Sequence, residues 1–101
     1  MMLPIVMEYN QEYTGEKFRE IARAMGVKGV DKMTLAQARK AAIAAVEKLS
    51  ADVGIPPNLK GVLKKEDVQF LAESAYADAC RPGNPRECSV AQIAKLYRSL
   101  M

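Results

Sequence analysis

Residues 55–89 read IPPNLKGVLKKEDVQFLAESAYADACRPGNPRECS, and the order of signals in this stretch decides the fold. The Gly54–Pro57 break stops the helix that precedes it, because a residue before proline avoids the α region. A helix from Glu66 to about Cys80 is predicted next, and its first residues are acidic, which complements the helix dipole. The Arg81–Arg86 loop then turns the chain back, and Ser89 is placed to cap a final helix.

Upstream of this stretch, apolar residues at helical spacing predict three more helices. We expect them, in chain order, at Met2–Met7, Thr14–Gly26 and Thr34–Val53, with Glu8–Tyr13 as a polar connector. Pro4 suits the first turn of a helix, and Thr34 and Gln37 have the spacing of a capping box. No strand pattern is present, so the sequence predicts an all-α bundle of about five helices.

The apolar stripes of these helices predict which residues form the core. Thr14 is the expected N-cap of the second helix, and the stripe of the third helix ends in Leu49 and Val53. Tyr76 and Tyr97 lie on the stripes of the last two helices, so both are expected to pack in the core.

The Met2–Met7 segment is apolar nearly all round, which is typical of a buried helix. At the start of a 101-residue chain this is an unusual place for a core element, so we expect further sequence upstream of it. Without that sequence, Leu3, Ile5, Val6 and Met7 would form an apolar patch, which predicts a homo-oligomer that buries them. A frayed N-terminus on a monomeric four-helix core is the alternative.

Composition limits the function classes. The 101 residues make one domain at most, and 15 basic and 12 acidic residues are interspersed at a net charge of +3, typical of a solvated surface. The chain contains no His, which removes the commonest general base and metal ligand, and no phosphate-binding glycine motif. The N-terminal run lacks the features of a signal peptide and no segment is long enough to span a membrane, so we expect a cytoplasmic protein.

Few side chains suggest chemistry. Cys80 and Cys88 are interpreted as free thiols, with a local bridge between them as the alternative. Carboxylates at Glu66, Asp67 and Asp78 are interpreted as helix-end electrostatics, although an acid–base role stays open. Two further side chains, Arg81 and Arg86, bracket a loop that could meet an anion or a partner carboxylate, and for Arg86 we favour a structural role that holds the loop against a neighbouring helix.

The order and spacing of several short motifs indicate a family. They are Val6–Asn10, Thr14–Lys17, Ile21–Val27, Asp52–Pro57, Lys65–Asp67 and Asp78–Glu87, the last containing an Asn-Pro-Arg loop after a cysteine. Together they cover essentially the whole chain, which resembles the C-terminal end of the iron-dependent alcohol dehydrogenases, in the group that contains lactaldehyde reductase. The chain would then be the C-terminal part, residues 1–101, of the helical metal-binding domain.

The resemblance implies an enzyme of two domains that oxidises alcohols or reduces aldehydes by hydride transfer. An α/β domain would bind NAD or NADP, and the helical domain would hold Fe²⁺ with one Asp and three His. None of those ligands matches a residue here, and Ile5 stands where many members have His. No catalytic, cofactor or metal residue is therefore expected in this chain, which would be inert alone. The resemblance carries over Cys80 as a wall of the substrate pocket, and it favours 1,2-propanediol and lactaldehyde over butanol or 1,3-propanediol.

An autonomous helical binding module, with DNA as one conceivable partner, is the alternative function. Thr14–Gly26 and Thr34–Val53 would form its helices, and Arg39, Lys40 and Lys48 would supply the positive charge. The connection between these helices is longer than a helix-turn-helix prefers, and the net charge is low for phosphate binding.

Overall fold

The computed structural model describes residues 1–101 and contains helices and no strands, which confirms the all-α prediction. Five α-helices follow one another as α1 (Met2–Asn10), α2 (Lys17–Ala24), α3 (Leu35–Asp52), α4 (Val68–Tyr76) and α5 (Val90–Ser99). Short 3-10 turns lie between them at Gln11–Tyr13, Val30–Lys32, Lys65–Asp67 and Arg81–Gly83.

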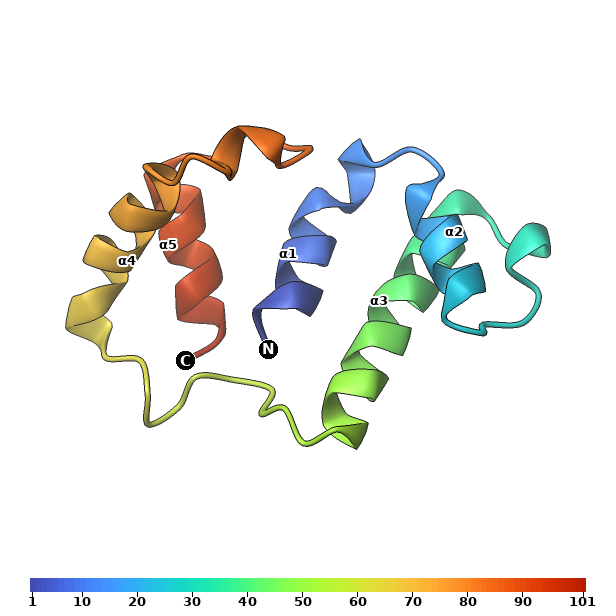
Figure 1. Ribbon diagram of the computed structural model, residues 1–101, viewed down its shortest axis with the longest axis horizontal. Helices are drawn as coiled ribbons and strands as arrows, with labels where there is room; N and C mark the ends of the chain where they lie inside the picture. The colour runs from blue at the N-terminus through green and yellow to red at the C-terminus, as the bar shows by residue number, and fades with distance from the viewer.

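Two helix pairs flank α1, which lies in the middle of the molecule (Figure 1). In the first pair α2 packs on α3, and in the second α4 packs on α5. The first helix also packs against α3, while the segment between α3 and α4 crosses from one pair to the other. Because of this side-by-side arrangement, the molecule is elongated, with extents of 45 × 30 × 19 Å.

Each helix pair has its own core. The larger core lies between α1, α2, α3 and the 3-10 turn at Val30–Lys32, and it contains Met7, Phe18, Ala22, Val30, Ala42 and Ile43. The smaller core lies between α4 and α5 and contains Val68, Ala72 and Ala94, with half-buried apolar side chains around it. Alanines at the centre of both cores let the helix backbones approach closely, but they bury little apolar area.

Local signals at the helix ends are confirmed. Thr34 Oγ1 accepts a hydrogen bond from the Gln37 backbone N–H at 3.2 Å, and Gln37 Oε1 accepts from Thr34 N–H at 2.9 Å. The same reciprocal capping box starts α5, where the distances between Ser89 and Gln92 are 3.1 and 2.8 Å. Gly54 follows the end of α3 with a φ of 82°, a conformation that glycine adopts without steric cost.

The prediction of a polar connector at Glu8–Tyr13 is wrong. The first helix continues to Asn10, and a 3-10 turn then covers Gln11–Tyr13. Thr14 is not the N-cap of α2 either, because its hydroxyl donates back to the carbonyl oxygen of Gln11 at 2.9 Å. Tyr9 and Asn10 in this segment form hydrogen bonds with residues from the far end of the chain, which a local pattern cannot reveal.

The predicted end of the fourth helix at Cys80 is also wrong, because α4 ends at Tyr76. Asp78 Oδ1 accepts a hydrogen bond from the Cys80 backbone N–H at 2.7 Å, and this local bond replaces another helical turn. Tyr76 is therefore exposed at the helix end and is not a core residue. Tyr97 is half-buried and packs against the smaller core, as predicted.

Only the first half of the apolar stripe of α3 is buried. Ala38 and Ala42 are buried, whereas Leu49 and Val53 are exposed, contrary to the prediction. The physical reason is length, because α2 has 8 residues and α3 has 18, so α2 covers only part of its partner.

None of the five helices combines the length and the apolar character that a membrane-spanning segment requires.

Candidate functional site

A pocket of about 400 Å³ lies where α1 meets the second helix pair. Its walls are mainly apolar, and they come from α1, from α5 and from the segment between α4 and α5. The lining residues used below are Met2, Val6, Tyr9, Asp78, Cys80, Arg81, Asn84, Cys88 and Ile93. An apolar pocket that also holds a few polar groups is the usual form of a small-molecule site.

The loop that carries the polar wall is fastened to α1 by a pair of amides. Asn10 Nδ2 donates to Asn84 Oδ1 at 2.8 Å, and Asn84 Nδ2 donates to Asn10 Oδ1 at 2.9 Å. The Asn84 amide also donates to the carbonyl oxygen of Arg86 at 2.6 Å. Because Asn10 is buried, this pairing satisfies an amide that would otherwise destabilise the fold.

Arg86 fastens the same loop at a second point, and the structural role predicted for it is confirmed. Its Nη1 donates to the carbonyl oxygen of Tyr9 at 2.8 Å. The guanidinium also lies 4.1 Å from the centre of the Tyr9 ring and 5.0 Å from that of Tyr13. The loop is therefore held against the last turn of α1 through both charge and stacking.

Tyr9 completes the connection between α1 and the second helix pair. Its hydroxyl donates to the carbonyl oxygen of Glu87 at 2.7 Å and lies 3.2 Å from Gln92 Oε1. Burial raises the pKa of the Tyr9 hydroxyl above its ordinary value, although the nearby Arg86 acts in the opposite direction. The hydroxyl therefore keeps its proton and remains a donor at neutral pH.

The two cysteines predicted as free thiols are both free, and both line the pocket. Cys80 is exposed and Cys88 is half-buried. The backbone N–H of Cys80 donates to Asp78 Oδ1, which holds the backbone that carries the thiol. Asp78 thus makes a local hydrogen bond just beyond the end of α4, and its helix-end electrostatic role stays a prediction.

The donor set of this chain does not fit iron. No group of three His, Cys, Asp or Glu side chains converges anywhere in the molecule. Glu66 and Asp67 lie in the 3-10 turn before α4, where they are exposed and complement the helix dipole. The pocket therefore offers no metal centre of its own.

A larger groove of about 530 Å³ lies between α3 and the Met25–Val27 segment that follows α2, and it is lined mainly by alanines and other apolar side chains. Its charged residues, Lys48 and Asp52, pair with each other at 2.8 Å. Arg39 is also engaged, because its Nη2 donates to the carbonyl oxygen of Gly15 at 3.2 Å. The basic residues proposed for DNA binding are thus partly occupied within the chain, and the groove offers no reactive group.

Comparison with known proteins identifies the family. Residues 1–101 match the C-terminal region of the Fe-containing alcohol dehydrogenase family. The chain belongs to this family. It is 52% identical to lactaldehyde reductase of Escherichia coli (strain K12), over 98% of this chain and 26% of that protein. It is 39% identical to 1,3-propanediol dehydrogenase of Klebsiella pneumoniae, over 97% of this chain and 25% of that protein.

A solved structure agrees with this family assignment. The crystal structure of a 1,3-propanediol oxidoreductase superposes with a TM-score of 0.92 at 36% identity, covering 99% of this chain and 26% of the other. The family resemblance expected from the motifs is therefore confirmed. The chain spans about a quarter of the length of the relatives it matches.

The sequence pattern indicates some residues of this site but not the residues of α1 that hold the loop. Cys80, Arg81 and Arg86 were singled out, and the structure brings the first two together at the pocket. Tyr9 and Asn10 were assigned to a connector, although they fasten the loop. The Asn-Pro turn was the available signal, but nothing in the sequence pointed to its partners on α1.

Proposed function

We propose that this chain forms the C-terminal part of the helical domain of an NAD(P)-dependent, iron-dependent alcohol dehydrogenase. Its substrates would be small alcohols and aldehydes, with lactaldehyde and 1,2-propanediol as the favoured pair. The 52% identity with lactaldehyde reductase along nearly the whole chain carries this proposal. Fe²⁺ would bind outside residues 1–101, because the donor set here does not fit a metal. NAD(P) would bind to the α/β domain that the family resemblance implies.

In this proposal the chain supplies one wall of the substrate pocket. Cys80 would face the substrate, and Met2, Val6 and Ile93 would exclude water from its apolar part. The Asn10–Asn84 pair and Arg86 would hold that wall in place. The alternative of an autonomous DNA-binding module is disfavoured, because the family match extends over residues 1–101.

A chimera tests this function. Residues 1–101 would replace the matching C-terminal quarter of E. coli lactaldehyde reductase, and NADH consumption with lactaldehyde would be followed by absorbance. We expect the chimera to reduce lactaldehyde at a rate within about tenfold of the parent enzyme, since volume-conserving exchanges between related cores are tolerated. The parent enzyme without its last quarter is the control and should be inactive. A folded, iron-loaded chimera without activity would contradict the proposal.

The partner of the exposed apolar side chains is proposed to be the remainder of the dehydrogenase, or a second copy when the chain is alone. Met7 is buried inside the molecule and needs no partner, whereas Leu3 on the same helix is 57% exposed. We expect the isolated chain to sediment as a dimer at micromolar concentration, and Leu3→Asp to shift it towards the monomer, because a buried unpaired charge is costly. A wild-type chain that sediments as a monomer would refute self-association.

A further inference from the structure

Arg81 differs from the other half-buried arginines of the chain. Arg19, Arg39 and Arg86 each donate at least one hydrogen bond to a backbone carbonyl oxygen. The guanidinium of Arg81 makes no hydrogen bond within the chain, and its Nε is buried without a partner. Its only polar contact is Glu87, 3.9 Å from Nη1, a distance too long for a hydrogen bond.

The position of Arg81 is nevertheless fixed. Its guanidinium carbon lies 4.1 Å from the centre of the Tyr76 ring, so the planar group is stacked on an aromatic face. The Glu87 side chain is 97% exposed, and an exposed ion pair of this length contributes little. A preorganised guanidinium with five N–H donors is therefore left at the pocket wall without an acceptor.

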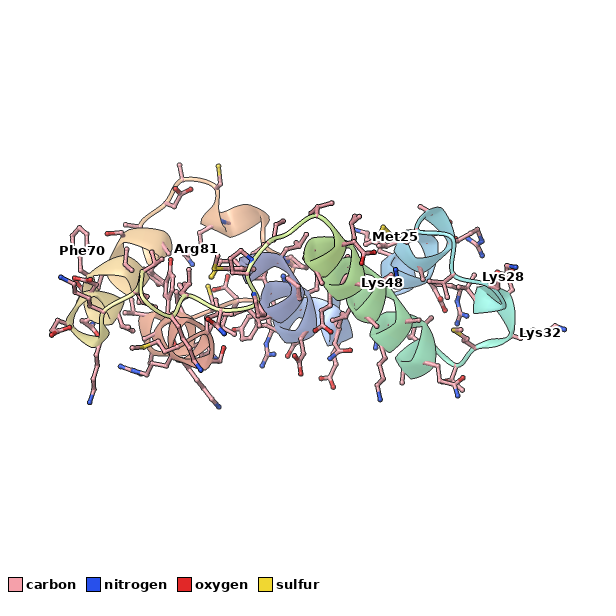
Figure 2. The ribbon with its side chains drawn as sticks, turned by 90° about the horizontal axis from the view of Figure 1, so that it is seen from below. Met25, Lys28, Lys32, Lys48, Phe70 and Arg81 are labelled. Atoms are coloured by element: carbon pink, nitrogen blue, oxygen red, sulfur yellow. The ribbon has the colours of Figure 1, made fainter.

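The neighbours of Arg81 indicate what kind of acceptor fits. Arg81 lies in the part of the molecule between the α4–α5 pair and α1 (Figure 2), and Val6 and Ile93 line the same pocket. Asp78 lines it too, so a carboxylate ligand would meet a negative charge beside the positive one. A hydroxyl group suits this pairing better, because its lone pair accepts from the guanidinium while its small apolar neighbour rests on the aliphatic wall.

We propose that Arg81 is a specificity-determining residue that donates a hydrogen bond to the second oxygen of a vicinal diol or hydroxyaldehyde, the hydroxyl on the carbon adjacent to the reacting carbon. This inference rests on the proposed function. It names Arg81 as the residue by which the enzyme would distinguish lactaldehyde from an aldehyde of the same length that lacks the hydroxyl. Cys80 and the aliphatic side chains would define the shape of the pocket, whereas Arg81 would recognise the substrate's second hydroxyl.

Binding to the chain itself gives the first test. In ¹⁵N-labelled protein, the Nε–H resonance of Arg81 should shift on titration with 1,2-propanediol and stay in place with 1-propanol. Arg39 is the matched control, because its Nε is also buried without a partner but lies outside the pocket. An Arg81 resonance that moves with neither alcohol, or with both equally, would overturn the proposal.

Catalytic specificity gives the second test, in the chimera with lactaldehyde reductase. Arg81→Met should lower kcat/KM for lactaldehyde relative to propanal by about tenfold to a hundredfold, the effect expected for one hydrogen bond to a charged group. The loss should appear in KM with kcat little changed, because the second hydroxyl does not take part in hydride transfer. Arg81→Lys should restore part of the preference, and Arg39→Met should leave it unchanged.

The outcomes separate this inference from the function on which it rests. An active chimera whose preference for lactaldehyde survives Arg81→Met would refute the role of Arg81 and leave the dehydrogenase function intact. A chimera that prefers a hydroxy acid to the diol would also overturn it, since Arg81 would then recognise a carboxylate. A shift of the Arg81 resonance with the diol in a chain whose chimera is inactive would support the binding site and refute the dehydrogenase function.

Discussion

Replacing Phe18 by Ala is expected to lower the free energy of unfolding by about 3–5 kcal/mol, because a large aromatic side chain leaves a cavity in the core. Phe18 is 6% exposed and packs with Met7, Ala22 and Ile43 at the centre of the larger core. A domain of this size is stable by about 5–15 kcal/mol in total, so the substitution should remove a large share of its stability. Urea denaturation followed by circular dichroism measures the change.

Phe70 offers a matched control for this variant. It is the second of the two phenylalanines of the chain and is 70% exposed on α4 (Figure 2). Phe70→Ala should change the free energy of unfolding by no more than about 0.5 kcal/mol, as is usual at exposed positions. Equal losses for the two variants would show that the burial of Phe18 does not stabilise the fold.

Replacing Arg86 by Ala should lower the free energy of unfolding by about 2–4 kcal/mol. The change removes a charged hydrogen bond to the Tyr9 carbonyl and stacking on two rings, worth about 1.5–3 and 0.5–1 kcal/mol respectively. Arg86 also connects α1 to the second helix pair, so amide hydrogen exchange in α5 should become faster. Urea denaturation and exchange measured by NMR report on the two effects.

Arg98 provides the comparison for Arg86. It is exposed in the last turn of α5, where its charge interacts favourably with the helix dipole but where its side chain makes no hydrogen bond within the chain. Arg98→Ala should therefore cost less than about 1 kcal/mol and leave exchange in the rest of α5 unchanged. A stability of Arg86→Ala indistinguishable from that of Arg98→Ala would refute the fastening role of Arg86.

What the sequence could predict depended on the distance between interacting residues. The capping boxes at Thr34 and Ser89 were recognisable because both partners lie within one helical turn. The end of α4 was misplaced because the short-range bond from the Cys80 N–H to Asp78 competes with helix continuation, and periodicity does not report such bonds. Leu49 was expected in the core because its stripe is apolar, but whether a partner covers it depends on the length of α2.

The site was less predictable than the helices. Asn10 and Asn84 are ordinary polar residues in sequence, and only the fold brings them into contact across 74 positions. Arg81 could be singled out as a loop arginine, but its lack of a hydrogen bond became visible only with the positions of its neighbours. Motif order revealed the family because it depends on many weak signals at once, whereas each contact in the pocket depends on a single pair.

The contacts that fasten α1 to the last helix also determine when the molecule can close. Tyr9 bonds to Gln92, a residue 83 positions further along, so nearly the whole chain must be synthesised before that contact can form. The larger core can assemble early, because its helices are neighbours in the sequence. Docking of α4 and α5 onto α1 requires the closure of a long loop, which slows folding. Until then α5 does not cover the side of α1 that later lines the pocket.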